Sequence, residues 1–111
     1  MEVKAIARFQ RVSPFKGRLV ADLIRGRDVN EAMGILAFTP KKTAVLLKKL
    51  LSSAIANATA RGGVNIDDLY VKRVMVDGGP TLKRIMTRSQ GRINRILKRT
   101  AHFTIVLDER D

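Results

Sequence analysis

The residues best suited to chemistry in this sequence are the cations of residues 81–100, which read TLKRIMTRSQGRINRILKRT. This segment has seven Lys or Arg residues and no acidic residue. The seven are Lys83, Arg84, Arg88, Arg92, Arg95, Lys98 and Arg99. Ammonium and guanidinium groups neutralise phosphates and release condensed counterions, and the planar guanidinium can hold two phosphate oxygens. The segment therefore indicates binding to a polyanion.

A second, weaker group of candidate anion-binding residues surrounds the first predicted strand and helix. It consists of Arg8, Arg11, Ser13, Lys16, Arg18 and Arg25. Ser13 precedes Pro14, a pattern typical of a helix amino terminus, where free backbone N–H groups can bind a phosphate. The sequence thus predicts a supporting anion-binding surface on the folded body.

The residue types needed for other kinds of site are missing or isolated. The chain has no cysteine, and His102 is its single histidine. A lone histidine without a clustered carboxylate is a poor metal-ligand set and a poor catalytic set. We therefore expect no catalytic residues, no metal, no cofactor and no small-molecule substrate, and we expect His102 to pack or to hydrogen-bond RNA.

Length and composition predict one folded domain with a strongly positive surface. The chain has 111 residues, a net charge of +12, 45% hydrophobic residues and a mean hydropathy of −0.07. Such a charge favours polyanions, with nucleic acid first and an anionic membrane surface second. No segment offers the roughly 20 apolar residues that cross a bilayer, and we expect no secretory signal in the first ten residues.

Apolar spacing predicts three helices in the first half of the chain. The first begins at Pro14 and ends before Gly26, and Phe15, Leu19 and Leu23, with Val20 and Ile24 beside them, form its apolar stripe. A second short helix follows Asp28, which with Glu31 resembles a capping box, and continues to Leu36. A third runs from about Lys41 to Ala60 after the cap-like pair Thr39-Pro40, with Leu47, Leu51, Ala54, Ile55 and Ala58 on one face.

Alternating residues predict strands at 3–9, 69–76 and 102–107, the last with Phe103, Ile105 and Leu107 facing inward. The fold class is therefore α+β, with an antiparallel sheet.

The conformation of the basic segment stays open on periodicity alone. Its arginines are spaced four, four, three and four apart, which is typical of a basic amphipathic helix. Such a helix would bind an anionic membrane or an acidic protein partner. Gly91 and the two flanking strands favour a β-hairpin instead, centred near Gln90, that would pair Leu82 with Lys98 and Met75 with Ile105.

Four stretches of the chain resemble one known family in the right order. Residues 79–106, GPTLKRIMTRSQGRINRILKRTAHFTIV, are similar to the carboxy-terminal hallmark of the ribosomal protein L-twenty-two family, bacterial type. The stretches SPFKGRLVADLIRG at 13–26, SSAIANA at 52–58 and IDDLYV at 66–71 resemble its first helix, third helix and strand start.

This resemblance implies a fold for the whole chain. It implies a single domain, 1–111, with a globular body formed by 1–77 and 101–111. The body would have three helices packed on a small three-stranded antiparallel sheet, and residues 78–100 would form a long protruding basic β-hairpin.

The resemblance also implies a function. The chain would bind and organise large-subunit (23S-type) ribosomal RNA during ribosome assembly, in the cytoplasm, beside neighbouring ribosomal proteins. Thr100 and His102 would join the seven hairpin cations in RNA binding. The hairpin tip would line the exit tunnel near the nascent polypeptide, and its residues would be Arg88, Ser89, Gln90, Gly91 and Arg92.

Overall fold

The computed structural model describes residues 2–79, 82–87 and 93–110, with the backbone alone described in 82–87 and 93–98. Its strands are β1 (Val3–Gln10), β2 (Leu69–Gly78), β3 (Leu82–Thr87), β4 (Ile93–Lys98) and β5 (Ala101–Glu109). Its helices are α1 (Pro14–Ile24), α2 (Val29–Phe38), α3 (Lys42–Arg61) and the short 3-10 helix η1 (Ile66–Asp68).

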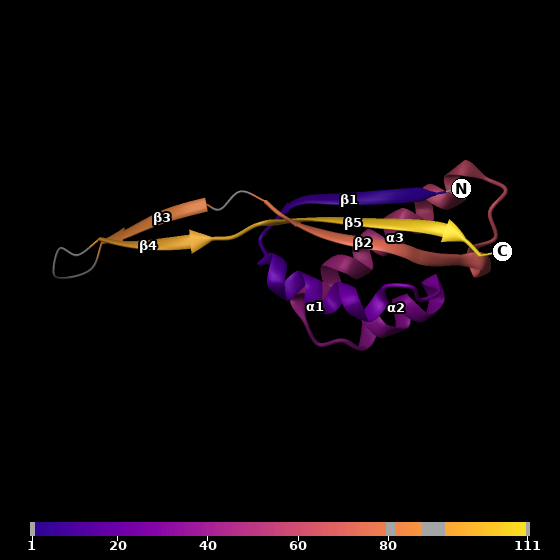
Figure 1. The fold of residues 1–111 in the computed structure, drawn as a ribbon, viewed down its shortest axis with the longest axis horizontal. Coiled ribbons are helices and arrows are strands. Elements are labelled where there is room, and N and C mark those ends of the chain that lie inside the picture. The colour runs from indigo at the N-terminus through magenta and orange to yellow at the C-terminus, as the bar shows by residue number, and fades with distance from the viewer. Residues whose placement is uncertain (1, 80–81, 88–92, 111) are drawn as a thin grey trace.

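Strand β5 lies at the centre of a three-stranded antiparallel sheet, between β1 and β2 (Figure 1). Val3 pairs with Leu107 on one side, and Val74 pairs with Ile105 on the other. Helix α1 packs against β2, and α3 packs against β1 and β5. The predicted α+β class, with three helices on a three-stranded antiparallel sheet, is confirmed.

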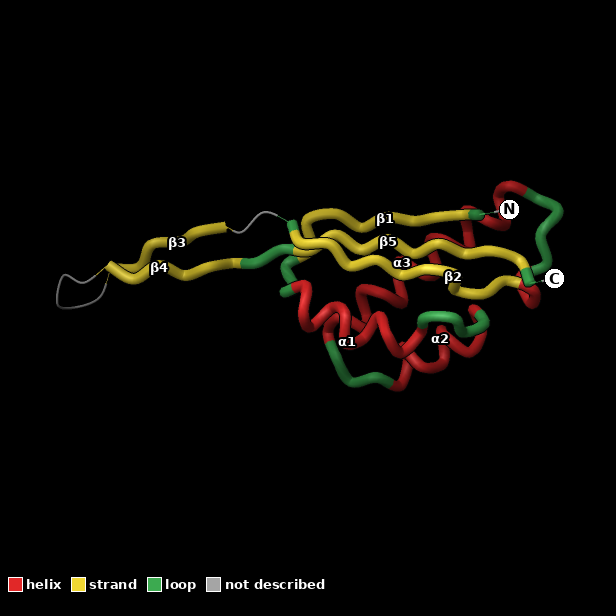
Figure 2. The backbone as a smooth tube through the Cα atoms, viewed as in Figure 1, coloured by secondary structure: helices red, strands yellow, loops and turns green. Residues whose placement is uncertain are grey.

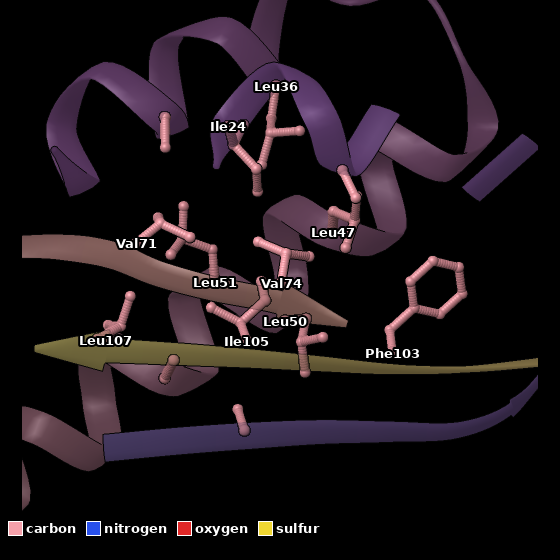
Figure 3. Close-up of a cluster of buried hydrophobic side chains, with 14 of the residues drawn as sticks. Ile24, Leu36, Leu47, Leu50, Leu51, Val71, Val74, Phe103, Ile105 and Leu107 are labelled. Carbon is pink, nitrogen blue, oxygen red and sulfur yellow. The ribbon is translucent and has the colours of Figure 1, made fainter. Parts of the chain in front are cut away.

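The core lies between the helices and the inner face of this sheet (Figure 3). Phe103, Ile105 and Leu107 of β5 are all fully buried there, as their alternation predicts. Leu47 and Leu51 of α3 are buried against them in the same cluster. The core is thus built from residues that the periodic patterns identify on β5 and α3.

Helix α1 buries only part of the apolar stripe that its residue spacing predicts. Phe15, Leu19 and Leu23 are exposed, whereas its buried residues are Gly17, Val20, Ala21 and Ile24. The predicted stripe is therefore right for Val20 and Ile24 and wrong for Phe15, Leu19 and Leu23. A Cβ atom on Gly17 would lie 2.8 Å from Cε1 of Phe103, so close approach of α1 to β5 requires the face with the smallest residue.

Only one of the three predicted helix starts is capped as expected. The Ser13 hydroxyl accepts a hydrogen bond from the Lys16 N–H at 3.4 Å, with Pro14 in the first turn. Asp28 makes no cap and instead accepts from Arg110 Nε at 2.6 Å. The Thr39 hydroxyl donates to the Ile35 carbonyl at the end of α2, so the cap predicted there for α3 is wrong.

Strands β3 and β4 form a separate two-stranded antiparallel ladder beyond the three-stranded sheet, on the side away from both chain ends (Figures 1 and 2). Leu82 pairs with Lys98, as predicted. Met75, however, pairs with Thr104 and not with Ile105. Three residues separate β2 from β3 but two separate β4 from β5, so the register shifts by one between the ladders.

Candidate nucleic-acid interface

At the end of the body that carries both termini, four cations are paired with acids. Arg27 bonds to Glu31 at 2.8 Å, and Arg110 bonds to Asp28. Glu2 binds both Arg73 and Lys72 there. The pairs are Arg27–Glu31, Arg110–Asp28, Arg73–Glu2, Lys72–Glu2 and Lys72–Asp108. These four cations are largely compensated, so they contribute little net attraction for a polyanion.

The hydrogen bond from Lys72 to Glu2, 3.3 Å long, raises the pKa of the Lys72 ammonium above its usual value. Lys72 is therefore charged throughout the neutral range and remains held by its carboxylate partners.

Near the opposite end, where β1 leads into α1, the exposed cations lack such partners. Among the residues that the structure describes, Arg8, Arg11, Lys16 and Lys42 have no ion pair. Arg11, Lys16 and Lys42 line one cleft of about 240 Å³ together with Ser13. Because no acid lines this cleft, its potential is positive and it suits an anion.

Two arginines of the same predicted group have partners inside the protein. Arg18 donates from Nη2 to the Val76 carbonyl at 3.1 Å, and Arg25 donates from Nη2 to the Val74 carbonyl at 2.8 Å. Both carbonyls belong to β2, an outer strand of the sheet. Arg25 also pairs with Asp22. These side chains satisfy backbone groups at a sheet edge, a structural role that their sequence positions do not reveal.

The two kinds of arginine should respond differently to one substitution. Arg18→Met should lower the free energy of unfolding by about 1–3 kcal/mol, because the Val76 carbonyl loses a charged donor. Arg8→Met should change stability by less than about 0.5 kcal/mol, since no described residue bonds to its side chain. Urea unfolding followed by circular dichroism measures both. Equal losses in the two variants would contradict this assignment.

His102 is fixed by the backbone of β1. Its Nδ1 accepts a hydrogen bond from the Phe9 N–H at 3.0 Å, and its ring meets the Phe9 ring edge-on at 4.8 Å between centroids. Because Nδ1 accepts, the proton of the neutral ring lies on Nε2. The packing role expected for His102 is thus present, and Nε2 remains the donor available to a ligand.

Thr100 and His102 also hold the start of the basic segment. The Gly79 N–H donates to the Thr100 carbonyl at 3.0 Å, and the Thr100 side chain is only 3% exposed. A Cβ atom at Gly79 would lie 2.5 Å from the Thr100 hydroxyl and 3.2 Å from His102 Nε2. Only glycine fits here, so these residues position the chain as it leaves β2.

The register of β3 and β4 distributes the hairpin cations over two faces. Opposite residues of an antiparallel pair share a face, and the faces alternate along each strand. Arg84 and Lys98 therefore lie on one face, and Lys83 and Arg95 lie on the other. Each occupies a position opposite an apolar residue, the four partners being Ile96, Leu82, Leu97 and Ile85. Neither face is entirely apolar, so this ladder has no side suited to dry packing.

The remaining predicted hairpin residues lie at its two ends. Arg99 follows β4 and is exposed. The predicted tip residues, Arg88, Ser89, Gln90, Gly91 and Arg92, lie outside the described residues. The structure thus brings Arg8, Arg11, Ser13 and Lys16 close to the root of the ladder and assigns Arg18 and Arg25 to the sheet.

Other kinds of site find no support in the described part of the chain. Within residues 2–79, 82–87 and 93–110, no three His, Asp or Glu side chains gather as a metal would need. None of the helices described is long and apolar enough to cross a membrane.

A three-stranded α+β body with unpaired cations at the root of a basic β-ladder is typical of small proteins that bind polyanions. Residues 5–108 match the family described as Ribosomal protein L22p/L17e. The chain is 60% identical over 109 residues to the large ribosomal subunit protein uL22 of Solidesulfovibrio magneticus, covering 98% of this chain and 99% of that protein. It is 52% identical to the protein of the same name from Desulfotalea psychrophila, with the same coverage.

The chain therefore belongs to the L22p/L17e family of ribosomal proteins. Proteins of this family are structural and non-enzymatic. The chain is a protein of the large ribosomal subunit, associated with the ribosome in the cytoplasm. The family resemblance of the four sequence stretches is confirmed.

Proposed function

We propose that this chain binds and organises large-subunit (23S-type) ribosomal RNA while the subunit assembles. The observation that carries the proposal is the distribution of charge: cations occupy both faces of the β3–β4 ladder and continue unpaired onto the adjoining end of the body. A narrow two-stranded ribbon is marginal in water by itself. Phosphates on both sides would neutralise its charge and stabilise it.

The RNA-binding residues of this proposal fall into two sets. The hairpin set is Lys83, Arg84, Arg88, Arg92, Arg95, Lys98, Arg99, Thr100 and His102. The body set is Arg8, Arg11, Ser13 and Lys16, with Arg18 and Arg25 contributing less because their guanidinium groups already serve β2. Thr100 acts through the backbone that it positions, and His102 acts through Nε2.

The tip of the hairpin is proposed to line the exit tunnel and to meet the nascent polypeptide. The support is the direction of the ladder, which lies on the side of the body away from the acid-paired end (Figure 1). The basic ladder would enter the RNA, while the compensated end faces outward toward neighbouring ribosomal proteins.

The rival function, membrane or acidic-groove binding by an amphipathic helix, has no support in the described residues. Residues 82–87 and 93–98 are strands. An amphipathic helix over this segment would require helical geometry there.

A single thiol at position 90 tests the proposal, because the chain has no cysteine of its own. Large subunits lacking this protein are reconstituted with the Gln90→Cys variant carrying a thiol-linked photo-crosslinker, washed in high salt and loaded with a stalled nascent chain. We expect the protein to stay with the subunit and position 90 to crosslink to the nascent chain.

The matched control is Lys48→Cys, on an exposed position of α3, which should be incorporated equally and give no nascent-chain crosslink. Incorporation without any crosslink from position 90 would refute the tunnel assignment alone. Loss of the wild-type protein from the RNA in the salt wash would refute RNA binding itself.

A further inference from the structure

Phe9 has a backbone conformation that a side chain rarely adopts. Its φ is +57°, and it is the only non-glycine residue with positive φ in the described part of the chain. The register of β1 against β5 shifts between Ala7 and Gln10, so Phe9 lies in this irregularity. The hydrogen bond from its N–H to His102 holds the conformation. Such strain costs of the order of 1–3 kcal/mol and persists only where the surroundings impose it.

The strained conformation directs an aromatic ring toward solvent. Phe9 is 61% exposed, although burial of a phenyl group is favourable. Its ring contacts His102 edge-on, so the ring is oriented while most of its surface remains open. A fixed, exposed aromatic ring offers a stacking platform, which the basic segment, without aromatic residues, does not contain.

The Phe9 ring lines a groove with an apolar floor and a basic rim. The groove has a volume of about 440 Å³. Its apolar residues are Phe9, Val12, Val45 and Leu46, and its charged residues are Arg11, Lys42 and Lys49. No acidic residue lines it. The groove therefore suits a flat apolar group attached to an anion.

A cleft suited to that anion adjoins the groove, because both are lined by Arg11, Val12 and Lys42. Helix α3 starts at this cleft, and no side chain caps its N-terminal N–H groups. Thr43, in the first turn, also lines the cleft, and no described residue bonds to its hydroxyl, which is therefore open to the cleft. An anion in the cleft could accept hydrogen bonds from this hydroxyl and from the N–H groups of the helix start.

We propose that this groove and cleft together bind one unstacked nucleotide of RNA. The base stacks on the Phe9 ring over Val45, and a phosphate of the same nucleotide occupies the cleft. There the phosphate accepts from the Thr43 hydroxyl and the free N–H groups of α3, and it pairs with Arg11, Lys16 and Lys42. The inference rests on the proposed binding of ribosomal RNA and adds to it a site that holds a base as well as a phosphate.

An RNA nucleotide fits the site better than an acidic peptide does. Single-stranded regions of RNA present splayed bases that stack on aromatic side chains. A glutamate or aspartate side chain would satisfy the cleft, but its aliphatic stem offers no flat surface to an exposed ring. The pairing of one oriented ring with one anion cleft is therefore specific to a base and its phosphate.

The test compares Phe9→Leu with Phe15→Leu, which makes the same change at an exposed aromatic residue of α1 outside the groove. Affinity is measured by filter binding to deproteinised large-subunit ribosomal RNA at salt concentrations from about 50 to about 300 mM. Phosphate contacts weaken measurably over this range. We expect Phe9→Leu to weaken binding about 5- to 100-fold without changing the salt slope, because stacking involves no counterion. Phe15→Leu should bind like the wild type.

Two further variants separate the base from the phosphate and control for folding. Phe9→Tyr keeps the ring and should retain wild-type affinity. Lys42→Gln should lower the salt slope by about one, since one phosphate contact is lost. Thermal melts by circular dichroism show whether the Phe9→Leu variant is folded. If it is unfolded, the wild-type protein is crosslinked to the RNA with ultraviolet light, and an RNA adduct at Phe9 supports the site.

Each contrary outcome has its own meaning. Equal affinity of Phe9→Leu and Phe15→Leu, or an adduct map without Phe9, would overturn the nucleotide site while leaving RNA binding intact. Wild-type protein that prefers duplex DNA to ribosomal RNA would instead overturn the proposed function, and the site with it. Stronger competition by poly-glutamate than by oligouridylate for the groove would identify an acidic peptide as its occupant.

Discussion

Replacing the seven cations of the basic segment by glutamine should abolish tight binding to large-subunit ribosomal RNA. The substituted residues are Lys83, Arg84, Arg88, Arg92, Arg95, Lys98 and Arg99. With about seven phosphates engaged, log affinity of the wild type should fall with log salt at a slope of roughly −5 to −6. Losing these contacts should flatten the slope and weaken binding on the order of 10³-fold or more at physiological salt.

A control for this prediction removes charge at the acid-paired end. Lys72→Gln combined with Arg73→Gln neutralises two cations that Glu2 already holds, so the salt slope should change by less than about one. If the hairpin variant bound ribosomal RNA like the wild type but lost affinity for anionic vesicles, the segment would be a membrane-binding element. Equal effects of the two variants would show that net charge, and not the ladder, determines binding.

Phe103→Ala should have the largest effect on stability. Phe103 of β5 (Figure 3) is the largest fully buried side chain among the described residues, and its ring lies against Gly17 of α1. Truncation of a buried phenylalanine removes its packing and leaves a cavity, so the free energy of unfolding should fall by about 3–5 kcal/mol. Since small domains are stable by about 5–15 kcal/mol, the variant should be close to unfolding at 37 °C. Urea denaturation measures the loss.

Phe38→Ala is the matched control, because Phe38 is 90% exposed and its truncation should change stability by less than about 0.5 kcal/mol. A second comparison tests the contact itself. A methyl group at Gly17 would overlap the Phe103 ring, so Gly17→Ala should destabilise by about 1–3 kcal/mol, and Phe103→Leu should relieve part of that loss. A Phe103→Ala loss no larger than that of Phe38→Ala would mean that the core is not assembled around this ring.

Elements whose signals are local could be predicted from the sequence. The alternation in residues 102–107 depends only on the pleat of one strand, and it identified Phe103, Ile105 and Leu107 as inward. The cap at Ser13 depends on residues within one helical turn, and it was found. The register of β2 against β5 depends on the two segments that join these strands to the β3–β4 ladder. Met75 pairs with Thr104 instead of the expected Ile105, because the segment 79–81 is one residue longer than the segment 99–100.

The face of α1 could be predicted only in part, because apolar residues cover more than one side of that helix. The predicted stripe contained Val20 and Ile24, which are buried, but packing against β2 and Phe103 selected the side with Gly17 and left Phe15, Leu19 and Leu23 exposed. Close packing is decided by shape as well as by polarity, and the shape of the opposing surface comes from strands distant in the sequence.

The amino-acid sequence by itself determined the fold class, the family and the positive charge of the protein, because charge and family motifs are properties of residue types and their order. Only the tertiary structure decided which cations are free. Arg8 and Arg18 look alike in the sequence, yet Arg18 serves a carbonyl of β2 and Arg8 does not. Only the structure placed Phe9 beside the uncapped start of α3, since that meeting requires the chain to fold back on itself.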